Sequence, residues 1–190
     1  MESVLSIALK EWSVVCDAVL AGQQALLLRK GGIYEAGGEF ELEHSRFVLF
    51  PTVLHQKPDS VKPAWRGKIK TADREPEEIT IRGWAEVFWI GRVPNRPAWD
   101  LLDDLHLWDK PLIDMRFNYR PEYPLYVIVL RAWALPESLK IAIDEQYAGC
   151  KSWVPLKESI NVRDSRAIKS DTELKHIQDR IEKTFGSATR

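Results

Sequence analysis

Two cations followed by two glycines, Arg29, Lys30, Gly31 and Gly32, have residue types that could hold an anion. They follow the apolar run at residues 25–28. A nucleotide-binding phosphate loop such as GxxxxGK[ST] needs backbone amides at the start of a helix, and neither that spacing nor a following helix is evident. We therefore predict a buried strand and a glycine turn, with Arg29 and Lys30 at the rim of a cleft, where they hold a phosphate or carboxylate.

Aromatic residues near basic ones form a second group of candidates. Trp84 lies in a segment that interleaves arginines with tryptophans, Arg116 and Tyr119 form a similar group, and Trp153 lies two positions after Lys151. Such groups can stack a base while a cation holds the backbone phosphate. Core packing is the alternative for each tryptophan. We predict ligand contacts by Arg116 and an aromatic wall from Trp84, Tyr119 or Trp153.

Candidates for catalysis are Cys150, His44 and His55. Lys151 would favour a thiolate at Cys150, and a nearby histidine would complete a nucleophilic pair. The two histidines are eleven residues apart, which is not a recognised spacing of metal ligands. We therefore expect neither a metal nor a cofactor, and a buried, unreactive cysteine is the alternative.

Five aspartates suggest another chemistry, since paired carboxylates can hold Mg²⁺ on a scissile phosphate. Three of them fall on one face of a predicted helix, where acids near the N-terminus interact with the helix dipole and face water. A metal-dependent nuclease or phosphodiesterase is therefore an alternative function. Its metal-binding carboxylates would come from Asp100, Asp103, Asp104, Asp109 and Asp114.

The composition limits the class of protein. The 190 residues are 45% hydrophobic and 29% charged, as in a globular protein, and no apolar run approaches the roughly 20 residues that span a bilayer. The formal net charge of −1 argues against a protein that coats nucleic acid, although a local basic patch stays possible. Lys10 and Glu11 interrupt the apolar N-terminal segment, so we expect no signal peptide and a cytoplasmic location.

The elements that must position these residues follow from periodicity and breakers. The predicted helices cover residues 6–20, a short stretch within 64–70, an insertion within 97–117, and a last helix that begins at a capping box of Ser170 and Glu173. The predicted strands cover residues 25–30, a broken stretch within 40–50 that ends at Pro51, and 79–93, 124–135, 139–143 and 152–156.

This order lacks the regular strand–helix alternation of a doubly wound sheet. We predict an α+β fold, a mixed β-sheet or small barrel with peripheral helices and a helical insertion. Residues 1–157 would form one globular domain. Residues 158–190 would form a linker and a helix whose apolar stripe, from Leu174 to Phe185, docks on the domain or on a protein partner.

Several segments resemble an uncharacterised prokaryotic family, a domain of unknown function associated particularly with cyanobacteria. They are ALKEWSVVCDAVLAGQQALLLRKGGI, FVLFPTVLHQ, RFNYRPEYPLYVIVLRAW and YAGCKSWVPL. Together they cover most of residues 8–156. The resemblance implies no established activity.

A helix, a glycine and a strand that ends in an arginine, as in residues 12–29, also look like the opening of the ASCH and EVE branches of the PUA-like fold. The insertion before Arg116 and Phe117 is loosely similar to EVE domains. This remote resemblance implies a small PUA-like barrel linked to recognition of RNA or modified bases. The chain is therefore expected to bind RNA, DNA or a modified nucleotide. It is not expected to bind a membrane. The alternatives are the nuclease, a Cys150 hydrolase and an accessory subunit that binds a protein through its last helix.

Overall fold

The structure is a computed structural model that describes residues 3–30, 41–74, 76–149 and 151–186. Its strands are β1 (Val4–Trp12), β2 (Leu26–Arg29), β3 (Arg46–Thr52), β4 (Glu78–Arg92), β5 (Tyr126–Ala142), β6 (Trp153–Asn161) and β7 (Arg166–Ala167). Its α-helices are α1 (Ser13–Leu20), α2 (Pro63–Arg66), α3 (Arg96–Asp100), α4 (Lys110–Asn118) and α5 (Asp171–Phe185).

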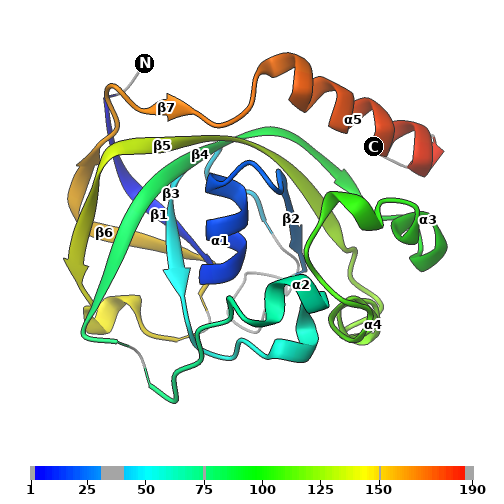
Figure 1. Cartoon of the computed structure of the whole chain (residues 1–190), viewed down its shortest axis with the longest axis horizontal. Helices are drawn as coiled ribbons and strands as arrows, with labels where there is room; N and C mark the ends of the chain where they lie inside the picture. Colours follow the sequence, from blue (N-terminus) through cyan, green and yellow to red (C-terminus); the bar gives the residue numbers. More distant parts are fainter. Residues whose placement is uncertain (1–2, 31–40, 75, 150, 187–190) are drawn as a thin grey trace.

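All seven strands belong to one open sheet in the order β2-β5-β4-β3-β1-β6, and β7 pairs with β5. β1 and β3 are parallel, whereas the other pairs are antiparallel. The sheet curves around α1, and the other helices lie at its periphery (Figure 1). The predicted α+β fold with a mixed sheet and peripheral helices is confirmed.

The predicted helix at residues 6–20 is wrong in its first half, which forms the strand β1. Ala8 pairs with Val48 on one side and with Val154 on the other, so β1 is an interior strand. An interior strand buried on both faces has no strict apolar–polar alternation, and here its apolar residues also fit a helical spacing. Pairing with two neighbours overrides the helical pattern, and α1 begins only at Ser13.

Two predicted strand boundaries at prolines are also wrong. We predicted that β3 ends at Pro51, but it continues to Thr52, and Pro51 pairs in register with Glu11. β5 joins two predicted strands across Pro136. The pairing of β4 with β5 shifts register beside Pro136, and such an irregularity removes the need for a backbone donor there.

α5 packs its apolar stripe against the domain. Leu174 and Ile181 are fully buried in the main core, and Phe185 is nearly so. The predicted capping box is present, with Ser170 and Glu173 bonded reciprocally. The helix lies on the outside of the curved sheet, next to β5 (Figure 1). No helix in the described ranges is long and apolar enough to cross a membrane.

Gly83 allows α1 to pack closely on the sheet. A Cβ at this position would overlap the side chain of Leu20 and the carbonyl oxygen of Trp133. We expect Gly83→Ala to lower the free energy of unfolding by about 1–3 kcal/mol, because the backbone oxygen cannot easily move away. Gly67→Ala is the control, since a Cβ there meets no atom within 4 Å. Equal denaturant midpoints for the two variants would contradict this account.

Candidate functional site

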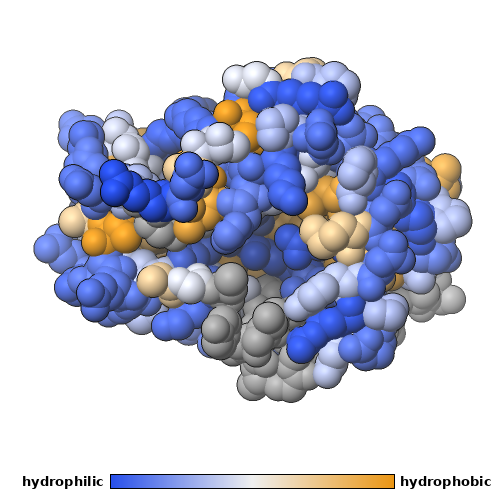
Figure 2. Space-filling model, turned by 90° about the horizontal axis from the view of Figure 1, so that it is seen from below, coloured by the Kyte–Doolittle hydropathy of each residue, from blue (hydrophilic) through white to orange (hydrophobic). Residues whose placement is uncertain are grey.

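A cavity of about 380 Å³ opens where the ends of β1, β2 and β3 meet. We call it the Arg29 cavity. β2 and β3 end on the lower side of Figure 1, and that face is largely hydrophilic and hollowed near its centre (Figure 2). The lining residues are Lys10, Glu11, Trp12, Arg29, Thr52, Leu54, His55, Arg116, Gly149, Lys151 and Ser152.

Curvature of the sheet brings the end of β2 to the end of β1, although three strands lie between them in the strand order. Arg29, the last residue of β2, donates from Nη2 to the carbonyl oxygen of Lys10 at 2.6 Å. The same nitrogen forms an ion pair with Glu11 Oε2 at 3.0 Å. The two side chains are 13% and 12% exposed, so the pair is largely shielded from solvent.

Arg29 keeps unused hydrogen-bonding capacity. Its Nε atom is buried and has no hydrogen-bond partner within the part of the chain that the structure describes. An unpaired buried donor is costly, and hydrogen bonds between a guanidinium and an anion are among the stronger ones in proteins. The Lys10 carbonyl and Glu11 therefore leave the guanidinium of Arg29 incompletely satisfied.

Arg116 brings a second guanidinium to the same cavity from the last turn of α4. Burial lowers the pKa of Arg116, Glu11 opposes that shift, and the nearby Arg29 lowers it further. The two arginines therefore repel each other across a single carboxylate. A second negative charge at this point would relieve the repulsion.

Two lysines add to the positive charge of the cavity. Lys10 is 8% exposed, and its ammonium donates to the Gly149 carbonyl at 3.2 Å and lies 5.8 Å from the centre of the Phe50 ring. Lys151 is exposed at the rim. Four cations thus line the Arg29 cavity together with one carboxylate, Glu11, which makes it a basic site on a chain of net charge −1.

Lys30 lines a different cavity from Arg29. Its ammonium donates to the carbonyl oxygens of Arg116 and Phe117, at 3.1 and 3.4 Å, in the last turn of α4. Burial lowers its pKa. Neighbouring residues at a strand end point to opposite sides, so the two cations separate. Lys30 therefore stabilises the C-terminal end of α4.

The predicted aromatic residues do not line the Arg29 cavity. Trp84 is buried, stacks on Trp133 at 3.9 Å and donates from its indole to Ser165 Oγ. Trp153 is half-buried and donates to the Glu41 carbonyl. Tyr119 is 37% exposed on the loop after α4. Trp84 and Trp153 contact residues of the fold, and Tyr119 is accessible to solvent beside the cavity wall that Arg116 forms.

The catalytic candidates are only partly brought together. His55 is exposed at the mouth of the Arg29 cavity, whereas His44 lies against the ring of Trp153, at 5.3 Å between ring centres. Cys150 lies outside the described residues. Cys16 is buried, and burial raises the pKa of its thiol, which makes it a poor nucleophile.

The five aspartates of the nuclease alternative are all engaged in ion pairs with cations. Their partners are Arg96 for Asp100 and Asp114, Lys62 for Asp103, Arg180 for Asp104 and Arg66 for Asp109. No cluster of three histidine, cysteine or acidic side chains suited to a metal occurs within the described parts of the chain. Their carboxylates form contacts within the helical insertion and with its neighbouring segments, and that of Asp104 contacts α5.

Sequence reasoning missed the contribution of β1. Lys10, Glu11 and Trp12 all line the Arg29 cavity. They were hidden because the segment was interpreted as a helix with Trp12 on its buried face. A charged pair between an apolar run and a tryptophan, KEW, was the available signal.

The chain matches a family model and solved structures. The family model DUF1802, described as a domain of unknown function, matches residues 8–180. The crystal structure of ASCH from Zymomonas mobilis is 12% identical, covering 80% of this chain and 87% of that chain at a TM-score of 0.43. A mutant of that protein gives 12% identity, coverages of 80% and 90%, and a TM-score of 0.44. Comparison with curated proteins finds no match. The chain is thus remotely similar to solved ASCH structures.

Proposed function

Since the chain belongs to the DUF1802 family, a domain of unknown function, we propose from its own geometry that it binds single-stranded nucleic acid or a modified nucleotide in the Arg29 cavity. The observation that carries the proposal is the excess of cations there. Arg29, Arg116, Lys10 and Lys151 line the cavity with one carboxylate, Glu11, and Arg29 keeps a buried N–H without a partner among the described residues. Two guanidiniums side by side suit the oxygens of a phosphate.

Trp12 supports a nucleotide over a simple inorganic anion. It is half-buried and lines the same cavity as the two arginines. Base stacking on an aromatic side chain is worth about 1–3 kcal/mol and tolerates any base. A phosphate on Arg29 and Arg116 with a base on Trp12 would use both kinds of group.

The proposal is tested by titrating the protein against labelled single-stranded RNA and DNA at several salt concentrations. The two arginines would neutralise one phosphate, which predicts a slope of log affinity against log salt of about −0.7, the value for each neutralised phosphate of a single strand. Unlabelled nucleotides with modified bases, added as competitors, would distinguish a base-specific pocket from a phosphate site. Absence of binding to RNA, DNA and all the nucleotides at low salt would overturn the proposal.

A further inference from the structure

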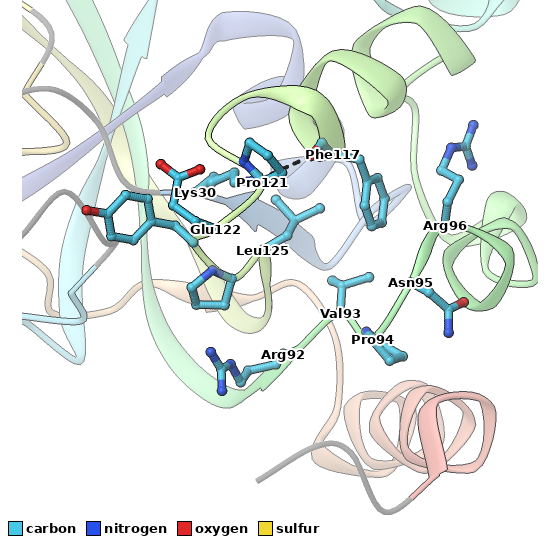
Figure 3. A pocket seen from close by; sticks show the side chains of 12 residues that line it. Lys30, Arg92, Val93, Pro94, Asn95, Arg96, Phe117, Pro121, Glu122 and Leu125 are labelled. Carbon is cyan, nitrogen blue, oxygen red and sulfur yellow. Dashed lines mark hydrogen bonds between the residues drawn. The ribbon is translucent and has the colours of Figure 1, made fainter.

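A second cavity, of about 550 Å³, lies next to the last turn of α4 (Figure 3). We call it the Arg92 cavity. Its apolar surface includes Val93, Phe117 and Leu125, which lie between the charged side chains in Figure 3. Arg92 and Glu122 are at its edge. A pocket with an apolar floor and a few charged groups at the edge suits a flat, apolar ring that carries an anion.

Arg92 is the cation of this cavity that is free to bind a ligand. It is exposed and forms no ion pair with any residue in the described ranges. By contrast, Lys30 donates to the carbonyls of α4. Arg96 forms ion pairs with Asp100 and Asp114. A phosphate at this cavity would therefore be held chiefly by Arg92.

The two cavities share a wall. Arg29 and Arg116 line the first, and their chain neighbours Lys30 and Phe117 line the second. The hydrogen bonds from Lys30 to the Arg116 and Phe117 carbonyls join the two halves of this wall. The two cavities therefore adjoin on either side of this wall, and a strand that occupies both would pass around its edge.

We propose that the Arg92 cavity is a second subsite, which binds the neighbouring nucleotide of the strand held in the Arg29 cavity. Its base packs on the apolar floor beside Phe117 and Tyr123, and its phosphate is held by Arg92. The inference rests on the proposed function of the Arg29 cavity. It adds a ligand class, a single strand of at least two nucleotides.

Affinity for strands of different length tests the second subsite. For Arg92→Ala we expect about a tenfold loss with a tetranucleotide and less than a twofold change with a 5′-mononucleotide, because one charge-assisted contact is lost. Tyr123→Leu, which removes the ring and keeps an apolar side chain, should act in the same direction. Arg163→Ala is the matched control, an exposed arginine on the turn after β6. It should leave both affinities unchanged.

Photo-crosslinking shows which cavity each end of the bound strand occupies. A tetranucleotide with 4-thiouridine at one end should label the peptide with Phe117 or Tyr123, and one with the label at the other end should label the peptide with Trp12. Equal affinities of wild-type protein and Arg92→Ala for the tetranucleotide would overturn the second subsite, as would equal losses for tetranucleotide and mononucleotide. Wild-type protein that binds a mononucleotide as tightly as a tetranucleotide overturns the subsite alone. Wild-type protein that binds neither overturns the proposed function as well.

Discussion

The double variant Arg29→Ala with Arg116→Ala is expected to bind single-stranded nucleic acid about 100-fold more weakly than the wild-type protein. Arg29 is 13% exposed and Arg116 is half-buried, so a charge-assisted hydrogen bond from either guanidinium to phosphate is stronger than one at an exposed site. About a tenfold loss for each arginine corresponds to about 1.4 kcal/mol. Fluorescence anisotropy at fixed salt, on each single variant and on the double variant, measures the effect.

The two arginines need different structural controls. Arg29→Ala also leaves Glu11 without its ion-pair partner, so part of its effect could come from a damaged fold. Arg29→Lys keeps a positive charge but loses the planar fork, and should cause an intermediate loss of affinity. Arg116→Ala removes the attraction to Glu11 together with the repulsion from Arg29, so its urea unfolding is measured beside its affinity. Unchanged affinity of folded Arg116→Ala protein would contradict the assignment.

The sequence predicted the elements whose signals are local. β2 lies within the predicted range of residues 25–30 and ends at Arg29, and the capping box before α5 is formed by the predicted pair, Ser170 and Glu173. β1 was misassigned because its spacing fits a helix as well as a strand buried on both faces. Only its pairing with β3 and β6, both distant in the chain, distinguishes the two.

The candidate site was predictable only in part. Arg29 stands at a strand end beside glycines, which marks it locally, whereas its approach to Arg116 depends on the curvature of the whole sheet. The separation of Lys30 from Arg29 follows from strand alternation, which applies once the end of β2 is known. The contacts of Trp84, by contrast, could not be predicted from local signals. Its stack on Trp133 requires the register of β4 against β5, which a single sequence does not reveal.

Stability of the protein is expected to fall by about 3 kcal/mol between pH 7.5 and pH 4 because of His106 alone. The imidazole is 6% exposed and lies between Trp99 and Trp108, at 4.9 and 5.4 Å between ring centres. Neither ring nitrogen has a hydrogen-bond partner of ordinary geometry within the described residues, and the nearby Trp108 backbone opposes the loss of the proton less than burial promotes it. Burial lowers the pKa of His106 to about 4, and the positive charge of Lys62 contributes in the same direction.

The sign of the change in stability with pH follows from proton uptake by His106. The unfolded chain binds a proton at His106 near pH 6.5, whereas the folded protein binds it only near pH 4. Stability is therefore lost as the pH falls through that interval. Asp103 opposes the shift and Arg96 adds slightly to it, so charge near the ring changes the size of the effect but not its sign.

The substitution His106→Phe isolates this contribution from the carboxylates that also titrate at low pH. Phenylalanine keeps the contact with Trp99 and Trp108 and removes both unpaired nitrogens. Urea unfolding of the two proteins from pH 7.5 to pH 4 should give a difference that is nearly constant above pH 7. The difference should then grow by about 3 kcal/mol in favour of the variant towards pH 4. A constant difference over the whole range would mean that the folded protein accepts the proton at His106 as readily as the unfolded chain does, and that the pocket between the two tryptophans does not exclude the charge.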